Sequence, residues 1–478
     1  MRFQRIWCLV AIVVPALTGY GAAPEDNWPS WRGPNNNGVA AKSNPPSTWS
    51  ETQNIKWKTA LPGHGTSTPI IWGDKIFFQT AVPTQEEPAP PAAPPQDKSQ
   101  VSGPQSGGTN PYGPQASAPQ PEGQRDGGRR EGGRSGRGGM RTPPPTFPYK
   151  FNVVCIDRKS GKLLWEKTAR EEVPHEGRHP TGSYASSSPV TDGKLMWVSF
   201  GSRGLYCYDL DGTQKWNRDL GKMQMKNSFG EGSSPALAGD AIVVLMDHEA
   251  GSKIMAFNKD TGEPLWEKAR EEATAWSSPH PVEVNGALQI VTAATNRIRS
   301  YNAKTGDIVW ECAGLTANTI PTPVSGFGRV FCTSGFRGYS LKAIDLAHTG
   351  DLTGTPAIAW EVAQGTPYVA SPLLYDDRIY LTADRGAVLS CYDAKSGKQL
   401  YSGQEIEGLA QIYASPAGAG DKIYIADREG KVAVVKKSDS FELLATNALD
   451  DGFDASPVFA GKELYLKGRK NLYCIAEN

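Results

Sequence analysis

The densest group of side chains able to do chemistry comes from two short stretches of the chain. His175, Glu176 and His179 stand in one stretch, and Asp247 and His248 stand in the other. Imidazole and carboxylate are ligands for Zn²⁺ or for Ca²⁺-like ions to different degrees, so these residues are a candidate metal or ligand site. The alternative is that they are hydrogen-bonded loop residues. Prolines bracket His175 and His179, which places the pair in a loop and not on one face of a helix.

A second candidate set consists of arginines that recur in short turns, often beside an aspartate. Guanidinium groups bind anionic or multiply hydroxylated ligands through forked, charge-assisted hydrogen bonds. The alternative interpretation is local ion pairing on a solvated rim. The arginines are Arg203, Arg297, Arg337, Arg385 and Arg428.

These candidates are distributed over a repeated phrase. Each copy reads Ser/Ala/Thr-Ser/Thr-Pro, an apolar run, a turn, a second apolar run, a Gly, then Cys/Ala/Ser-x-Asp/Asn, a Gly and a Trp. From Pro189 onward the prolines are 46, 44, 44, 49, 44 and 41 residues apart. A period of 40–50 residues with four short strands is typical of a β-propeller blade. The eight copies start at Pro69, Pro189, Pro235, Pro279, Pro323, Pro372, Pro416 and Pro457.

The sequence therefore predicts an all-β fold, an eight-bladed propeller of four-stranded antiparallel blades. The last copy has no fourth strand, while residues 54–58 resemble one, so we expect an N-terminal strand to close the ring. Closure removes exposed sheet edges. In such blades the fourth-to-first and second-to-third connections lie on one face of the ring. That face carries the candidate residues, and loops on a rigid scaffold are where function concentrates.

The recurrent aromatic residues that end each phrase are predicted to pack in the seams between blades. A sugar-binding or cofactor-binding role is the alternative, but the regular recurrence favours packing. The residues are Trp165, Trp216, Trp266, Trp310, Trp360 and Tyr401.

Four segments complete the predicted organisation. Residues 1–23 have a basic start, an apolar core and small residues before the cleavage position, which is typical of a signal peptide. Residues 24–53 are an irregular leader expected to lie across the propeller of residues 54–478. Residues 82–149 contain 15 Pro and 12 Gly in 68 residues, which predicts a disordered insert within blade one, rich in arginine near its end.

The charge balance, the apolar runs and the cysteines limit the partners and crosslinks that we expect. The chain has 478 residues with 50 Lys+Arg and 50 Asp+Glu, and this balance argues against nucleic-acid binding. No apolar run after residue 23 is long enough to span a membrane. Of the six cysteines beyond the signal peptide, Cys312 and Cys332 are the only plausible disulfide pair.

The phrase Asp-x-x-Ser/Thr-Gly-x-x-x-Trp resembles the repeat of the pyrroloquinoline-quinone (PQQ)-like propeller family. One branch of that family consists of quinone-dependent dehydrogenases that use PQQ and Ca²⁺. Another contains non-catalytic exported scaffolds that resemble the outer-membrane-assembly lipoprotein. The chain lacks the adjacent cysteine pair usual in the first branch and the lipobox cysteine usual in the second.

We therefore expect an exported monomer, in the periplasm or outside the cell. Its expected role is a scaffold that binds an envelope protein or a small anionic or polyhydroxy ligand on the Arg/His-rich face. The alternatives are a PQQ- or metal-dependent oxidoreductase acting on alcohols or sugars, with PQQ and Ca²⁺ as cofactors, and a polysaccharide-binding module. No catalytic residue is assigned.

Overall fold

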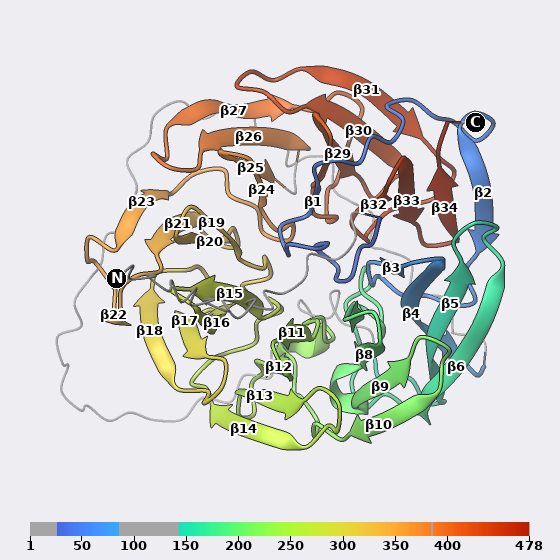
Figure 1. The fold of residues 1–478 in the computed structure, drawn as a ribbon, viewed down its shortest axis with the longest axis horizontal. Helices are drawn as coiled ribbons and strands as arrows, with labels where there is room; N and C mark the ends of the chain where they lie inside the picture. Colours follow the sequence, from blue (N-terminus) through green and yellow to red (C-terminus); the bar gives the residue numbers. More distant parts are fainter. Residues whose placement is uncertain (1–25, 86–142, 384–385, 478) are drawn as a thin grey trace, which may run out of the picture.

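The computed structural model describes residues 26–85, 143–383 and 386–477, and these form a closed ring of eight sheets around a central axis. The predicted eight-bladed, all-β propeller is confirmed (Figure 1). The signal-peptide prediction, residues 86–142 of the insert and Arg385 lie outside the described residues. No helix in the described segments could cross a membrane.

Each blade is an antiparallel meander whose first strand lies innermost. Blades one to four comprise β3 Ile70–Trp72, β4 Lys75–Pro83, β5 Tyr149–Asp157 and β6 Leu163–Glu172; β7 Val190–Thr191, β8 Leu195–Ser199, β9 Leu205–Asp209 and β10 Gln214–Arg218; β11 Ala236–Ala238, β12 Ala241–Met246, β13 Lys253–Asn258 and β14 Pro264–Ala269; and β15 His280–Val284, β16 Ala287–Ala293, β17 Arg297–Asn302 and β18 Ile308–Ala313.

The remaining blades follow the same order. They comprise β19 Val324–Gly326, β20 Arg329–Ser334, β21 Ser340–Asp345 and β23 Ile358–Val362; β24 Leu373–Tyr375, β25 Arg378–Ala383, β26 Val388–Asp393 and β27 Gln399–Glu405; β28 Ala417–Ala419, β29 Lys422–Ala426, β30 Lys431–Lys436 and β31 Leu443–Ala448; and β32 Val458–Ala460, β33 Glu463–Lys467, β34 Asn471–Ile475 and the N-terminal β2 Ile55–Ala60. Strand β2 pairs antiparallel with β34, so the predicted closing strand is confirmed.

A ring of hydrogen bonds explains the hydroxyl residue before each proline. The backbone N–H of this residue donates to the side-chain hydroxyl of its counterpart in the next blade, at 2.9–3.1 Å, and Ser456 returns to Thr68. Proline then directly precedes the inner strand, at a position where its missing N–H costs nothing. The hydroxyl ring consists of Thr68, Ser188, Ser234, Ser278, Thr322, Ser371, Ser415 and Ser456.

The recurrent aromatics lie at the seams between blades. The indole N–H of Trp216 donates to Lys259 O in the next blade, and that of Trp266 donates to Ala303 O. A Cβ on Gly262 would stand 2.6 Å from the ring of Trp216. Gly262 also has φ +70°. The turn therefore needs glycine for two reasons: its backbone is left-handed, and the indole leaves no space for a side chain.

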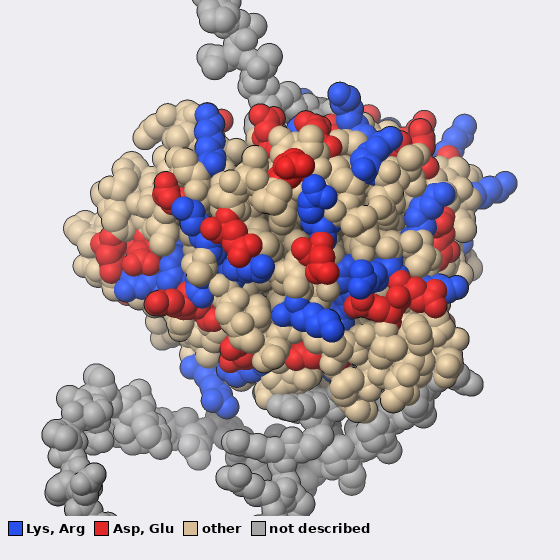
Figure 2. Space-filling model, turned by 90° about the horizontal axis from the view of Figure 1, so that it is seen from below, with Lys and Arg blue, Asp and Glu red and all other residues tan. Residues whose placement is uncertain are grey.

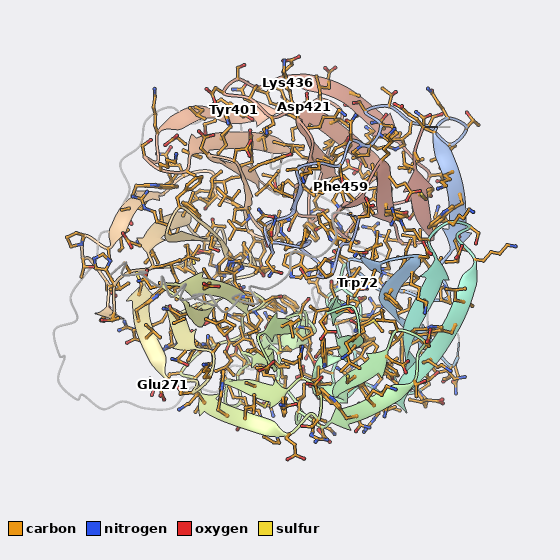
Figure 3. All side chains as sticks on the ribbon, viewed as in Figure 1. Trp72, Glu271, Tyr401, Asp421, Lys436 and Phe459 are labelled. Carbon is orange, nitrogen blue, oxygen red and sulfur yellow. The ribbon has the colours of Figure 1, made fainter. Side chains whose placement is uncertain are left out.

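The same contact recurs around the ring. A Cβ would come within 2.9 Å of the neighbouring indole at Gly212 beside Trp165, Gly306 beside Trp266 and Gly397 beside Trp360. Tyr401 packs against Phe441, and Trp310 is fully buried. Side chains fill the interior from blade to blade (Figure 3).

Two additions to the blades have no counterpart in the repeat. The stretched turn of blade five forms β22, Gly350–Asp351, which pairs parallel with β18 of blade four. The leader forms β1, Val39–Ala40, which pairs parallel with β28. All six cysteines of the described residues are free and buried, so Cys312 and Cys332 do not form a disulfide.

Candidate functional site

Two faces of the ring differ in what covers them. We call the face with the fourth-to-first and second-to-third connections the loop face, and the other the turn face. The leader crosses the turn face, where Asn27 accepts a bond from Gly73 N and Asn44 N donates to Gly461 O. Its strand β1 pairs with β28, and the leader runs past β3 and β32 in Figure 1. The loop face carries the candidate residues, and these leader bonds lie on the opposite face.

The structure brings three residues of the predicted cluster together around one loop segment, residues 223–225. His175 Nε2 bonds to Met223 O at 2.7 Å, so this nitrogen carries the proton. Gln224 N donates to His248 Nδ1 at 3.2 Å, and Met225 N donates to a Glu176 carboxylate oxygen at 3.0 Å. Burial lowers the pKa of His248. These side chains therefore hold the loop between blades two and three in place.

Arg203 lies next to this cluster and is almost fully buried. It donates to Glu231 at 2.9 Å, and Glu231 also accepts bonds from the backbone and hydroxyl of Ser202. Its guanidinium stacks over Phe151 and Tyr184. Two adjoining hollows, about 470 and 250 Å³ with open solvent included, share Tyr184 and Glu231 in their walls.

His179 and Asp247 do not join the cluster. His179 bonds to Thr181 and packs edge-on against Phe229, and burial together with Arg428 lowers its pKa. Asp247 is buried and binds Arg270 through both oxygens, at 2.7 and 3.0 Å. It therefore belongs to the core between blades three and four and not to the rim.

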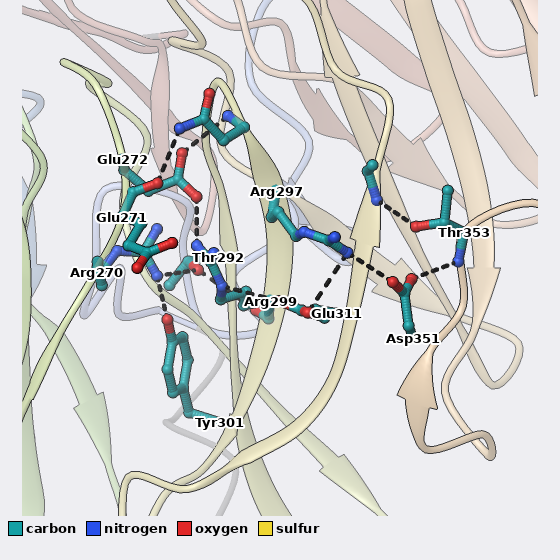
Figure 4. A network of polar contacts seen from close by, with 12 residues as sticks. Arg270, Glu271, Glu272, Thr292, Arg297, Arg299, Tyr301, Glu311, Asp351 and Thr353 are labelled. Carbon is teal, nitrogen blue, oxygen red and sulfur yellow. Dashed lines mark hydrogen bonds and ion pairs between the residues drawn. The ribbon is translucent and has the colours of Figure 1, made fainter.

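A chain of ion pairs continues from Arg270 across blade four (Figure 4). Arg270 also donates to Thr292 and Tyr301. A second buried pair joins Arg299 to Glu272, and Arg299 also donates to Glu311 at 3.2 Å. The chain ends at the surface. There Arg297 donates to Asp351 of the extra strand β22 at 2.9 Å.

Of the other described arginines in the predicted set, Arg428 forms an ion pair and Arg337 is exposed. Arg428 donates to Asp454 at 2.6 Å and lies 4.4 Å over the ring of Tyr413. Arg337 is exposed, has φ +55° and lies 5.3 Å over the ring of Phe336. Phe336 stacks on Tyr368 at 4.9 Å, and Tyr339 beside it is 52% exposed. The loop face of blade five thus presents an aromatic and guanidinium patch, which consists of Phe336, Arg337, Tyr339 and Tyr368.

The donor sets do not fit a metal or the quinone with its calcium ion. Within the described ranges no three His, Cys, Asp or Glu side chains converge as metal ligands. Ca²⁺ takes six to eight oxygen ligands. The carboxylates of Glu231 and Asp247 are already bound by Arg203 and Arg270. We derive no oxidation step from this site.

Sequence reasoning missed three residues that matter here. Arg270 and Glu231 are the partners of Asp247 and Arg203, and each lies 23 or more positions from its partner in the chain. Arg32 belongs to the leader, and nothing in the sequence indicated where this side chain would lie. Its guanidinium is buried in the ring, bonded to Pro372 O and Pro416 O.

These features define a class: a closed eight-bladed propeller with its leader bound to one face. The family model described as "Outer membrane protein assembly factor BamB" matches residues 149–274, 250–357 and 353–476. The matches span more than half of the chain, and the chain belongs to this family.

Individual relatives agree with the family match. The chain is 24% identical over 316 residues to the outer membrane protein assembly factor BamB of Bordetella pertussis, covering 64% of this chain and 73% of that protein. It is 22% identical over 341 residues to the BamB of Burkholderia pseudomallei, covering 66% and 76%. A europium-containing methanol dehydrogenase superposes with a TM-score of 0.58 at 10% identity, over 94% of this chain and 90% of that one, which shows a shared fold alone.

Proposed function

We propose that the protein is an exported, non-catalytic scaffold of outer-membrane assembly that binds an envelope protein through its loop face. The observation that carries the proposal is the family match over residues 149–476. The two relatives that the chain matches over 73% and 76% of their length are described as outer membrane protein assembly factors.

The patch on blade five supports the loop face as the binding surface. Arginine and tyrosine are enriched among residues that dominate binding energy at protein interfaces. Arg337 has no ion-pair partner among the described residues, whereas Arg203, Arg297 and Arg428 do. A left-handed backbone at a non-glycine residue costs energy and is found preferentially at functional loops.

The charge distribution is compatible with a neutral scaffold. Lys/Arg and Asp/Glu are interspersed over the side of the ring seen in Figure 2, with neither sign dominating. A partner bound by long-range attraction to a single-sign surface is therefore not indicated. Local contacts such as those of the blade-five patch are the expected source of affinity.

The test is removal of the gene in its native cell, followed by measurement of folded outer-membrane proteins. We expect their amount to fall and to be restored by the wild-type gene. The R337A/Y339A double variant should restore it poorly, although its folded amount should equal that of the wild type. Unchanged outer-membrane protein levels after deletion would contradict the proposal.

A further inference from the structure

The loop between blades two and three reaches across the loop face to blades further along the ring. It comprises residues 219–235, from the end of β10 to the start of β11, and we call it the crossing loop. Lys226 N donates to Thr274 Oγ1, between blades three and four, at 2.9 Å. Lys226 Nζ donates to Asn318 Oδ1, between blades four and five, at 3.1 Å. Contacts with several other blades therefore hold this loop in place.

The crossing loop forms a wall of both hollows on the loop face. Met223, Met225 and Glu231 line the larger hollow, and Glu231 also lines the smaller one. Asn227 and Ser228, in the middle of the loop, have φ +55° and +51°. Two successive non-glycine residues in the left-handed region are unfavourable without surrounding contacts. Loss of those contacts would therefore release the loop and open the hollows.

Two histidines bond to the crossing loop in opposite directions. Nε2 of His175 donates to Met223 O at 2.7 Å, a bond that a neutral and a protonated imidazole can both make. Nδ1 of His248 instead accepts, from Gln224 N of the crossing loop and from Ala250 N, both at 3.2 Å. An imidazolium has no nitrogen that can accept. Protonation of His248 therefore breaks both of its bonds and leaves the bond of His175 intact.

The surroundings of His248 determine in which direction pH acts. Burial lowers its pKa, and nearby carboxylates oppose this effect. Because a released imidazole has the higher, ordinary pKa, it takes up a proton first as pH falls, so acid favours release. A protonated His248 also attracts the carboxylate of Glu176, which accepts Met225 N at 3.0 Å. The charged side chains around His248 are Asp247 and Lys253 of blade three, Glu249 next to it, Glu231 of the crossing loop and Glu176 of the loop before blade two.

We infer that the crossing loop is an acid-released lid over the two hollows, with His248 as its switch. At neutral pH the imidazole accepts Gln224 N and holds the lid closed. In acid the protonated ring and Gln224 N are both donors, and the lid opens and exposes Met223 and Met225. This inference concerns the protein alone and stands whether or not the protein takes part in outer-membrane assembly.

Hydrogen exchange of the purified protein at pH 7.5 and pH 5.0, corrected for the intrinsic exchange rates and followed by mass spectrometry, tests the switch. We expect protection of residues 223–230 to fall at least about tenfold at pH 5.0. The equivalent loop between blades six and seven, residues 406–416, has no histidine and should keep its protection. Unchanged protection of residues 223–230 in acid would overturn the inference.

Two variants identify the group that titrates. H248N places a carbonyl oxygen near the position of Nδ1, so it keeps an acceptor that does not titrate, and the crossing loop should stay protected at both pH values. H348N removes an exposed histidine of blade five and should respond to acid as the wild type does. An equal loss of protection in H248N and the wild type would show that His248 is not the switch.

Methionine oxidation by hydrogen peroxide needs no variant and covers the case in which H248N does not fold. Met223 and Met225 are each 5% exposed, and Met196, in the same blade as the start of the loop but outside the hollows, is 0% exposed. The oxidation rates of Met223 and Met225 relative to Met196 should rise at least about fivefold from pH 7.5 to pH 5.0. The same relative rates at both pH values would contradict an opening lid.

Discussion

The two faces of the ring contrast in how their charged residues are used. On the loop face, the residues that look most reactive in the sequence are largely engaged within the protein: Asp247 with Arg270, Arg203 with Glu231, and Arg428 with Asp454. On the turn face, the leader, which has no repeat, places Arg32 inside the ring, where the guanidinium donates to three backbone carbonyls. The contrast shows that a dense cluster of polar residues in a repeat protein can join neighbouring blades and need not mark a ligand site.

The largest expected effect tests whether the Asp247 cluster is core and not rim. D247N leaves Arg270 buried and unpaired, and should lower the free energy of unfolding by about 3–5 kcal/mol. R297M breaks the partly exposed pair with Asp351 and should cost less than about 1 kcal/mol. Urea unfolding of both variants measures the difference. A loss of less than about 1 kcal/mol in the free energy of unfolding of D247N would show that Asp247 behaves as a surface residue.

The next effect tests whether the leader is an integral part of the turn face. Trp28 is fully buried, packs edge-on against Phe459 and pairs through its backbone with Ile71. W28A should cost about 3–5 kcal/mol because large buried aromatic side chains leave cavities. Limited proteolysis should then cut the leader faster than in L444A, a control at an exposed site. Equal cleavage rates would show that the leader docks without Trp28.

A smaller effect, which depends on pH, tests the burial of His280. The pKa of His280 is about 4 in the folded protein and near its ordinary 6.5 in the unfolded chain, so the unfolded chain binds the proton first as pH falls. Stability from neutral His280 is therefore present above about pH 6.5 and is lost towards pH 4. Relative to H280Q, the wild type should lose up to about 3 kcal/mol over this range.

Thermal unfolding of both proteins from pH 7 to pH 4.5 measures that difference. Parallel pH profiles for the wild type and H280Q would mean that His280 is solvated, which would contradict its burial.

Much of the fold was predictable because the repeat encodes it locally. Turn glycines, strand-starting prolines and seam aromatics each have a reason within one blade, and residues 54–58 match the missing strand. The partners of Asp247 and Arg203 were not predictable, because a pattern gives the face on which a residue lies but not the direction of its side chain. Arg270 and Glu231 come from neighbouring loops with no motif of their own. The place of Arg32 depends on the docking of a nonrepetitive leader, which no period indicates.

The scaffold account is tested most directly by matched photo-cross-linking on blade five. Tyr339 on the loop face is 52% exposed and Phe327 on the turn face is 48% exposed, so each can be replaced by a photoreactive residue with similar access. In native cells we predict a specific cross-link to a protein of the outer-membrane assembly machinery from position 339, and none from position 327. Equal cross-linking from both positions, or cross-linking from position 327 alone, would contradict binding through the loop face.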